Sequence, residues 1–105
     1  MTTRAYIGFA AFFLGGITSG ALASLAFEGG DGTTCDKAIV IKGATNEFEG
    51  VASEYRYLTE RHPGWTLKEQ SLLHSGDRSF DLLKFVTADG KERRACFDIS
   101  EFYQP

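Results

Sequence analysis

The charged residues of this chain are distributed very unevenly, and this limits what its N-terminal part can form. The chain has 105 residues with 11 basic and 14 acidic side chains, yet Arg4 is the only one of these 25 that precedes Glu28. Residues 5–27 carry no charge, and residues 7–14 read IGFAAFFL. A helix that is apolar on every face does not suit the core of a small soluble domain. The sequence therefore predicts an apolar leader followed by a polar domain.

Two interpretations of the leader remain open. In the first it is a secretory signal peptide, since a basic residue, an apolar run and the small-x-small site Ala21-Leu22-Ala23 follow one another, with cleavage after Ala23. In the second it is a retained membrane anchor, since residues 5–27 at ~1.5 Å per residue span a hydrocarbon core of ~30 Å. Both place Arg4 in the cytoplasm and the following domain outside it. We expect a periplasmic or secreted protein after cleavage, and otherwise a single-pass membrane protein whose membrane contact is confined to residues 5–27.

The rest of the chain is expected to be a single domain. We predict a signal peptide or anchor over residues 1–27, a flexible glycine-rich linker over residues 28–34 and an exported domain over residues 35–105. Residues 28–105 hold 10 basic and 14 acidic side chains, a formal net charge of 10 − 14 = −4. Nucleic-acid binding needs a basic face that neutralises phosphates. This balance therefore argues against a nucleic-acid partner.

The chain has two cysteines, Cys35 and Cys96, and both fall in the predicted exported domain. An even number of cysteines in a small exported domain indicates a disulfide. The bridge would close a loop of about 60 residues and contribute on the order of 4 kcal/mol of stability. Cys96 lies on the predicted polar face of the last strand, so we expect the bridge near a sheet edge. Two cysteines and two histidines at scattered positions match no zinc pattern.

Hydrophobic periodicity predicts an α+β fold with the element order β-α-β-β-β. The run Ala38-Ile39-Val40-Ile41 indicates a buried strand, and strands are expected over residues 65–74, 80–87 and 93–99. We expect a bulge in the second of these strands at Leu72-Leu73. Asp89-Gly90 favours a hairpin turn between the last two strands. The economical arrangement is one helix packed on a four-stranded antiparallel sheet.

The helix is predicted over residues 47–61. Asn46 and Glu49 have the spacing of a capping box, and His62-Pro63-Gly64 ends the helix. The apolar stripe that should face the sheet consists of Phe48, Val51, Tyr55 and Leu58.

We find no catalytic set, no cofactor motif and no metal site in the sequence. His74, Ser75 and Asp77 lie within one tight turn, where three side chains cannot adopt the head-to-tail geometry of a catalytic triad. Asp81 and Asp98 fall on neighbouring predicted strands and are expected to be solvated surface charges. A small hydrolase that uses His74, Asp77 and Asp98 remains an alternative hypothesis.

The favoured hypothesis is a small exported interaction module, such as an inhibitor or an accessory subunit, with a protein partner in the cell envelope and no enzymatic activity. Aromatic and arginine side chains are enriched at binding hot spots. Tyr57 falls off the apolar stripe of the predicted helix, so we expect it to be exposed. The candidate contact residues are Tyr57, Trp65, Arg93 and Arg94. A single-pass, membrane-anchored structural protein is the alternative if the leader is retained.

Overall fold

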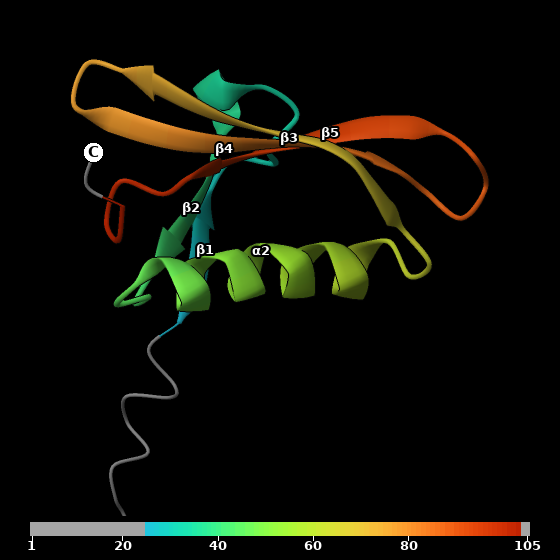
Figure 1. The fold of residues 1–105 in the computed structure, drawn as a ribbon, viewed down its shortest axis with the longest axis horizontal. Coiled ribbons are helices and arrows are strands. Elements are labelled where there is room, and N and C mark those ends of the chain that lie inside the picture. Colours follow the sequence, from blue (N-terminus) through green and yellow to red (C-terminus); the bar gives the residue numbers. More distant parts are fainter. Residues whose placement is uncertain (1–24, 104–105) are drawn as a thin grey trace, which may run out of the picture.

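The computed structural model describes residues 25–103. The predicted cleavage after Ala23 and nearly all of the predicted span over residues 5–27 lie outside these residues. Within residues 25–103, no helix is both long enough and apolar enough to cross a membrane. The described residues form a sheet with α2 lying across one face (Figure 1).

The sheet has five strands in the order β1-β2-β5-β4-β3. The strands are β1 (Ala26–Gly29), β2 (Ile39–Lys42), β3 (Thr66–Ser75), β4 (Arg78–Val86) and β5 (Glu92–Asp98). The α+β class is confirmed, but the expectation of an antiparallel sheet is wrong, because β2 and β5 pair in parallel. The helix α2 returns the chain so that β3 runs in the direction of β2. Two reversals through the β3-β4-β5 meander then bring β5 back to that direction.

The strand β1 lies where the sequence predicted the end of the leader and the start of a flexible linker. It pairs antiparallel with β2, and Phe27 packs against the core. The following residues are also fixed, because the Gly30 amide donates to the Ala38 carbonyl at 3.0 Å and the Gly32 amide to the Lys37 carbonyl at 2.8 Å. The boundaries at residues 27 and 34 are therefore corrected: the folded domain already includes residues 26–34.

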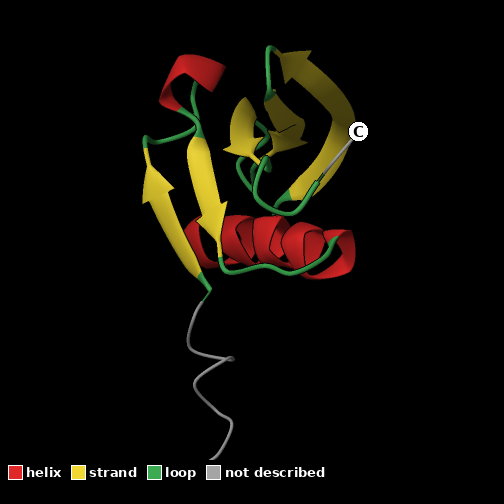
Figure 2. Cartoon of the chain, turned by 90° about the vertical axis from the view of Figure 1, so that its left-hand side faces the viewer, coloured by secondary structure: helices red, strands yellow, loops and turns green. Residues whose placement is uncertain are grey.

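The helix α2 (Glu47–Arg61) has the bounds that its capping signals predict. The Asn46 side chain accepts a hydrogen bond from the Glu49 amide at 2.9 Å, and the Glu49 carboxylate accepts one from the Thr45 amide at 2.9 Å. The His62 amide donates to the Leu58 carbonyl and closes the last turn. Figure 2 shows the helix across the sheet, with the β1-β2 pair at one side.

The predicted apolar stripe of α2 is wrong in part. Phe48 is 84% exposed, and Tyr55 is also exposed. The buried positions of the helix are instead Gly50, Ser53, Glu54 and Leu58. Small residues on this face let the helix approach the sheet, and the Phe102 ring fills the space beside Gly50, where a Cβ atom would overlap it.

The disulfide between Cys35 and Cys96 is confirmed, with a Cα–Cα distance of 5.2 Å. Its expected position near a sheet edge is wrong, because β5 is the central strand and Cys96 is 0% exposed. The short 3-10 helix η1 (Cys35–Lys37) lies over the face of β5 that is opposite to α2. A second apolar cluster forms there, made of Ala38, Phe80 and Cys96 with Cys35 and Leu82 packed against it.

The β3-β4 hairpin is long, and β3 lies at the edge of the sheet. The pairing shifts register between Leu67 and Glu69, so the bulge predicted at Leu72-Leu73 lies earlier in the strand. Beyond β5, a turn places Phe102 and Tyr103 against the core. This turn and the β3 edge form part of the surroundings of α2.

Candidate functional site

A cleft of about 400 Å³ lies beside the C-terminal end of α2. Side chains from the segment before η1, from the end of α2, and from β4 and β5 enclose it. The lining residues are Asp31, Thr33, Tyr57, Leu58, Arg61, His62, Phe85, Arg93, Arg94 and Ala95. Three of the four predicted contact residues, Tyr57, Arg93 and Arg94, are thereby brought together in one place.

Tyr57 forms the aromatic wall of the cleft, but it is half-buried, so the expectation that it is exposed is wrong. Its ring packs edge-on against Phe97 at 5.5 Å and against Phe27 at 5.0 Å. The periodicity missed this because β1, which supplies Phe27, was not expected. The guanidinium of Arg61 lies 3.7 Å from the centre of the Tyr57 ring, close enough for a cation-π contact.

Positive charge dominates the cleft. Among the described residues, none of the arginines Arg61, Arg93 and Arg94 forms an ion pair within 4 Å. The acidic group that lines the cleft is Asp31, whose carboxylate accepts hydrogen bonds from the amide and hydroxyl of Thr33 at 3.0 and 2.8 Å. These bonds lower the pKa of Asp31. The cleft thus presents Arg61 and Arg93 against one carboxylate, while Arg94, the next residue of β5, lies opposite Lys84 and directs its side chain to the other face of the sheet.

The cleft continues into a neighbouring cavity that adds one acidic residue, Asp89, and no further arginine among the described residues. This cavity of about 290 Å³ shares His62 and Arg93 with the cleft and continues over Pro63 and residues 87–89. Arg61 and His62 were not among the predicted contact residues. The spacing of Tyr57 and Arg61, four residues apart on one helix, is a signal that could have identified Arg61.

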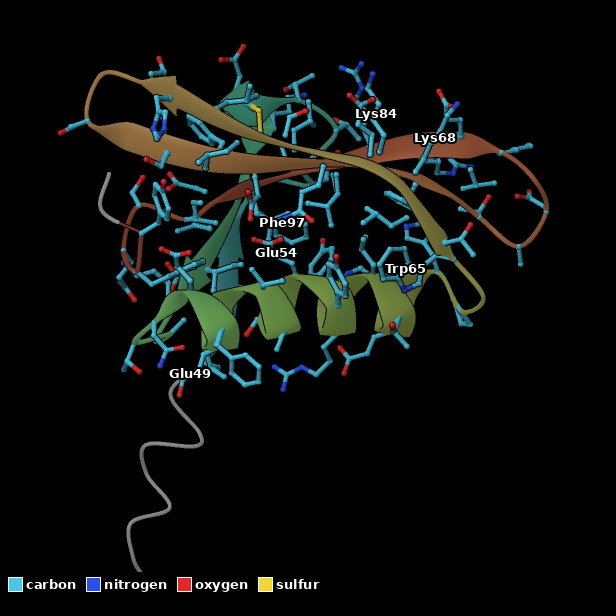
Figure 3. The ribbon with its side chains drawn as sticks, in the orientation of Figure 1. Glu49, Glu54, Trp65, Lys68, Lys84 and Phe97 are labelled. Atoms are coloured by element: carbon cyan, nitrogen blue, oxygen red, sulfur yellow. A yellow bond between two sulfur atoms is a disulfide. The ribbon has the colours of Figure 1, made fainter. Side chains whose placement is uncertain are left out.

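Trp65, the fourth predicted contact residue, lies next to the cleft rather than in its wall. Its indole nitrogen donates to the Thr59 hydroxyl at 2.9 Å, and its ring packs edge-on against Phe85 at 6.2 Å. Phe85 lines the cleft. Figure 3 shows Trp65 at the end of α2 where the chain enters β3. It is the single tryptophan of the chain, so its fluorescence can report on this cleft.

A second unusual group lies deeper in the molecule, between α2 and the sheet. The Glu54 side chain points from α2 toward the sheet (Figure 3), is 0% exposed, and accepts no hydrogen bond from any described residue. Burial and the neighbouring Asp81 carboxyl raise the pKa of Glu54 to about 10. At neutral pH Glu54 therefore holds a proton that it can donate to Asp81.

Asp81 and Asp98 are not the solvated surface charges that the sequence predicted. Asp81 is 7% exposed and Asp98 is 8% exposed. The two do not form a pair, because Asp81 lies opposite Phe97 and Asp98 lies opposite Phe80, which places their side chains on different faces of the sheet. Asp98 instead accepts two hydrogen bonds from the Arg78 guanidinium at 2.8 and 3.1 Å.

The residues of the alternative hydrolase hypothesis are separated in the structure. The Nδ1 atom of His74 lies 3.0 Å from the Ser79 hydroxyl, and this serine is buried. Asp98 is held by Arg78 on the other face of the sheet, and Asp77 lies in the turn between β3 and β4. Residues 25–103 also contain no group of three or more His, Cys, Asp and Glu side chains able to hold a metal ion.

Comparisons of the chain with protein-family models, with curated proteins and with solved structures gave no match. The functional conclusion therefore rests on the geometry and charge of the cleft.

Proposed function

We propose that this chain is a small exported interaction module that binds an acidic segment of a partner protein in the cleft at the end of α2. The observation that carries the proposal is the pair Arg61 and Arg93, which have no ion-pair partners among the described residues and lie beside the aromatic wall that Tyr57 forms. Arginine pairs with carboxylates through two parallel hydrogen bonds, and arginine and tyrosine are enriched where proteins bind each other.

The proposed compartment is extracytoplasmic. The disulfide supports this, since such bonds persist in oxidising environments and are rare in the cytosol. The apolar leader supports it independently, because a signal peptide and a membrane anchor both export the domain.

Charge selection is the property to test. The full-length protein is titrated with the peptide acetyl-Asp-Glu-Leu-Glu-Asp-amide and with its neutral counterpart acetyl-Asn-Gln-Leu-Gln-Asn-amide, while Trp65 fluorescence and calorimetric heat are recorded. We expect saturable binding of the acidic peptide that weakens as salt is added, because exposed charges are screened.

The variant R93E places a negative charge in the cleft and should weaken binding of the acidic peptide by about tenfold or more. Lys91 lies two residues before Arg93, in the β4-β5 connection, and does not line the cleft, so K91E is the matched control for net charge. Equal affinity for the two peptides, or equal losses in R93E and K91E, would contradict a specific acidic-segment site.

A further inference from the structure

A separate cavity of about 150 Å³ lies at the other end of α2. Its walls come from the first turns of the helix, from the edge strand β3, from β4 and from the C-terminal turn. The lining residues are Glu47, Val51, Gln70, Leu72, Asp81, Ile99, Phe102 and Tyr103. The cavity shares no lining residue with the basic cleft, so it requires its own explanation.

The charged residues that line this cavity are all acidic. Glu47 and Asp81 are acidic, and no lysine, arginine or histidine lines the cavity. Asp81 is nearly buried, and its carboxylate accepts a long hydrogen bond from the Gln70 amide at 3.4 Å. Next to it lies the fully buried carboxyl of Glu54, which accepts no hydrogen bond within the described part of the chain.

Two neighbouring buried carboxyl groups destabilise the folded state unless a positive charge or a proton compensates their negative charge. Glu54 keeps its proton, so the pair carries one negative charge, centred on Asp81. Besides the proton of Glu54, that charge has one neutral donor among the hydrogen bonds of the described residues, the Gln70 amide at 3.4 Å. A group that brings positive charge to Asp81 would compensate it.

The apolar walls of the cavity favour a lysine or arginine side chain over a metal ion. Val51, Leu72, Ile99 and Phe102 present hydrocarbon surface and supply no oxygen ligands from their side chains, so a hydrated divalent ion gains little there. Lysine and arginine side chains have aliphatic stems that lie along apolar surface and charged ends that need a polar partner. The cavity has this division between apolar walls and an acidic group.

The edge strand β3 offers a place where a partner segment that carries such a side chain can bind. Within residues 25–103, β3 has a strand partner on one side only, so its other edge offers free main-chain groups over Thr66–Ser75. Leu72 and Gln70 belong to this strand and line the cavity. A segment that adds to β3 would direct alternate side chains to the helix side, because successive residues of a strand point to opposite faces.

We propose that this cavity is a binding site for a lysine or arginine side chain of a partner segment that adds to the free edge of β3. Asp81 pairs with the charged end, Glu54 holds its proton next to it, and the apolar walls cover the stem. The site is independent of the basic cleft, and the experiments on the two sites do not share a probe.

The test uses the isotope-labelled full-length protein and two peptides, acetyl-Thr-Val-Lys-Val-Thr-amide and the same peptide with norleucine in place of lysine. Amide resonances are followed during titration to about 10 mM peptide. We expect saturable shifts along β3 and around Asp81 with the lysine peptide, and at least about tenfold weaker binding of the norleucine peptide, since a hydrogen-bonded charge is lost.

The variant D81N should remove the preference for lysine, while D77N, in the adjacent turn outside the cavity, should keep it. The comparison of the two peptides on the unmodified protein decides the matter even if D81N fails to fold. Equal binding of the peptides to the unmodified protein, lysine-dependent shifts outside the cavity, or no binding at about 10 mM would each overturn the proposal.

Discussion

Replacement of Glu54 by glutamine tests the buried carboxyl pair directly. Glutamine keeps the size of the side chain but cannot ionise. Burial and the Asp81 carboxyl raise the pKa of Glu54 from 4.5 to about 10 in the folded protein. Between these values the folded state holds one proton more than the unfolded chain. The stability that Glu54 contributes is therefore fully present below about pH 4.5 and falls as the pH rises.

The expected size of the effect is large. One proton corresponds to about 1.4 kcal/mol of unfolding free energy per pH unit, so the unmodified protein should lose roughly 3 to 4 kcal/mol between about pH 5 and pH 8. E54Q does not titrate and should be about 3 kcal/mol more stable than the unmodified protein near pH 7. The lowered pKa values of Asp98 and Glu101 affect stability in the opposite direction, as the pH falls below about 5, which is outside the range measured.

The measurement is urea unfolding of both proteins at several values from about pH 5 to pH 8, with the disulfide intact. Glu60 is an exposed glutamate of the same helix, so E60Q serves as the control and should change stability by less than about 0.5 kcal/mol. A flat pH profile for the unmodified protein, together with an E54Q variant that is no more stable near pH 7, would refute the buried proton.

Removal of the disulfide in C35S/C96S should lower the unfolding free energy by about 4 kcal/mol, since the bridge closes a loop with a sequence separation of 61; urea unfolding measures this, and a loss below about 1 kcal/mol would contradict it. Gly50→Ala should destabilise the protein by about 1 to 2 kcal/mol although alanine favours helices, because the new methyl group overlaps the Phe102 ring; a more stable variant in thermal unfolding would show that the ring moves freely. Phe48→Ser should change stability by less than about 0.5 kcal/mol in the same measurement, and a larger loss would restore Phe48 to the core.

Local signals in the sequence predicted the helix well and its orientation poorly. Asn46 and Glu49 fix the first turn through short-range hydrogen bonds, so the bounds of α2 follow from neighbouring residues alone. The face that α2 buries depends on long-range packing, in which Phe102 occupies the space beside Gly50. Of the buried positions of the helix, a search for apolar side chains finds only Leu58, because the others are Gly50, Ser53 and the protonated Glu54.

The strand β1 shows a second limit. Its sequence, AFEG, has no alternation strong enough to indicate a strand, and its stability comes from pairing with β2 and from Phe27 on the core. The direction of β5 against β2 is likewise set by the path of the whole chain. Pairings between distant segments decide both features, and a local pattern does not contain them.

For the candidate site, the sequence suggests residue types but does not show which of them lie together. Residue type indicates Arg93 and Arg94, since arginine is enriched at binding hot spots, and Tyr57 is indicated by its place off the apolar stripe of the predicted helix. The structure places all three around one cleft and adds Arg61, which lies over Tyr57. The acidic cavity was missed, since Glu54 and Asp81 are 27 residues apart and isolated acidic residues are normally exposed.

The disulfide also determines how the molecule responds to a mechanical load. If the two ends of the chain are pulled apart, the disulfide transmits the tension directly from Cys35 to Cys96. The segment between these cysteines, which have a sequence separation of 61, therefore cannot be extended. About 200 Å of contour length is thereby withheld from extension. The helix and the β3-β4 hairpin lie inside this closed loop. The segment before Cys35, with β1, lies outside the loop and yields first, so a force on the N-terminal side removes Asp31 and Thr33 from the basic cleft. The parts of both cavities that α2, β3 and β4 supply stay within the closed loop.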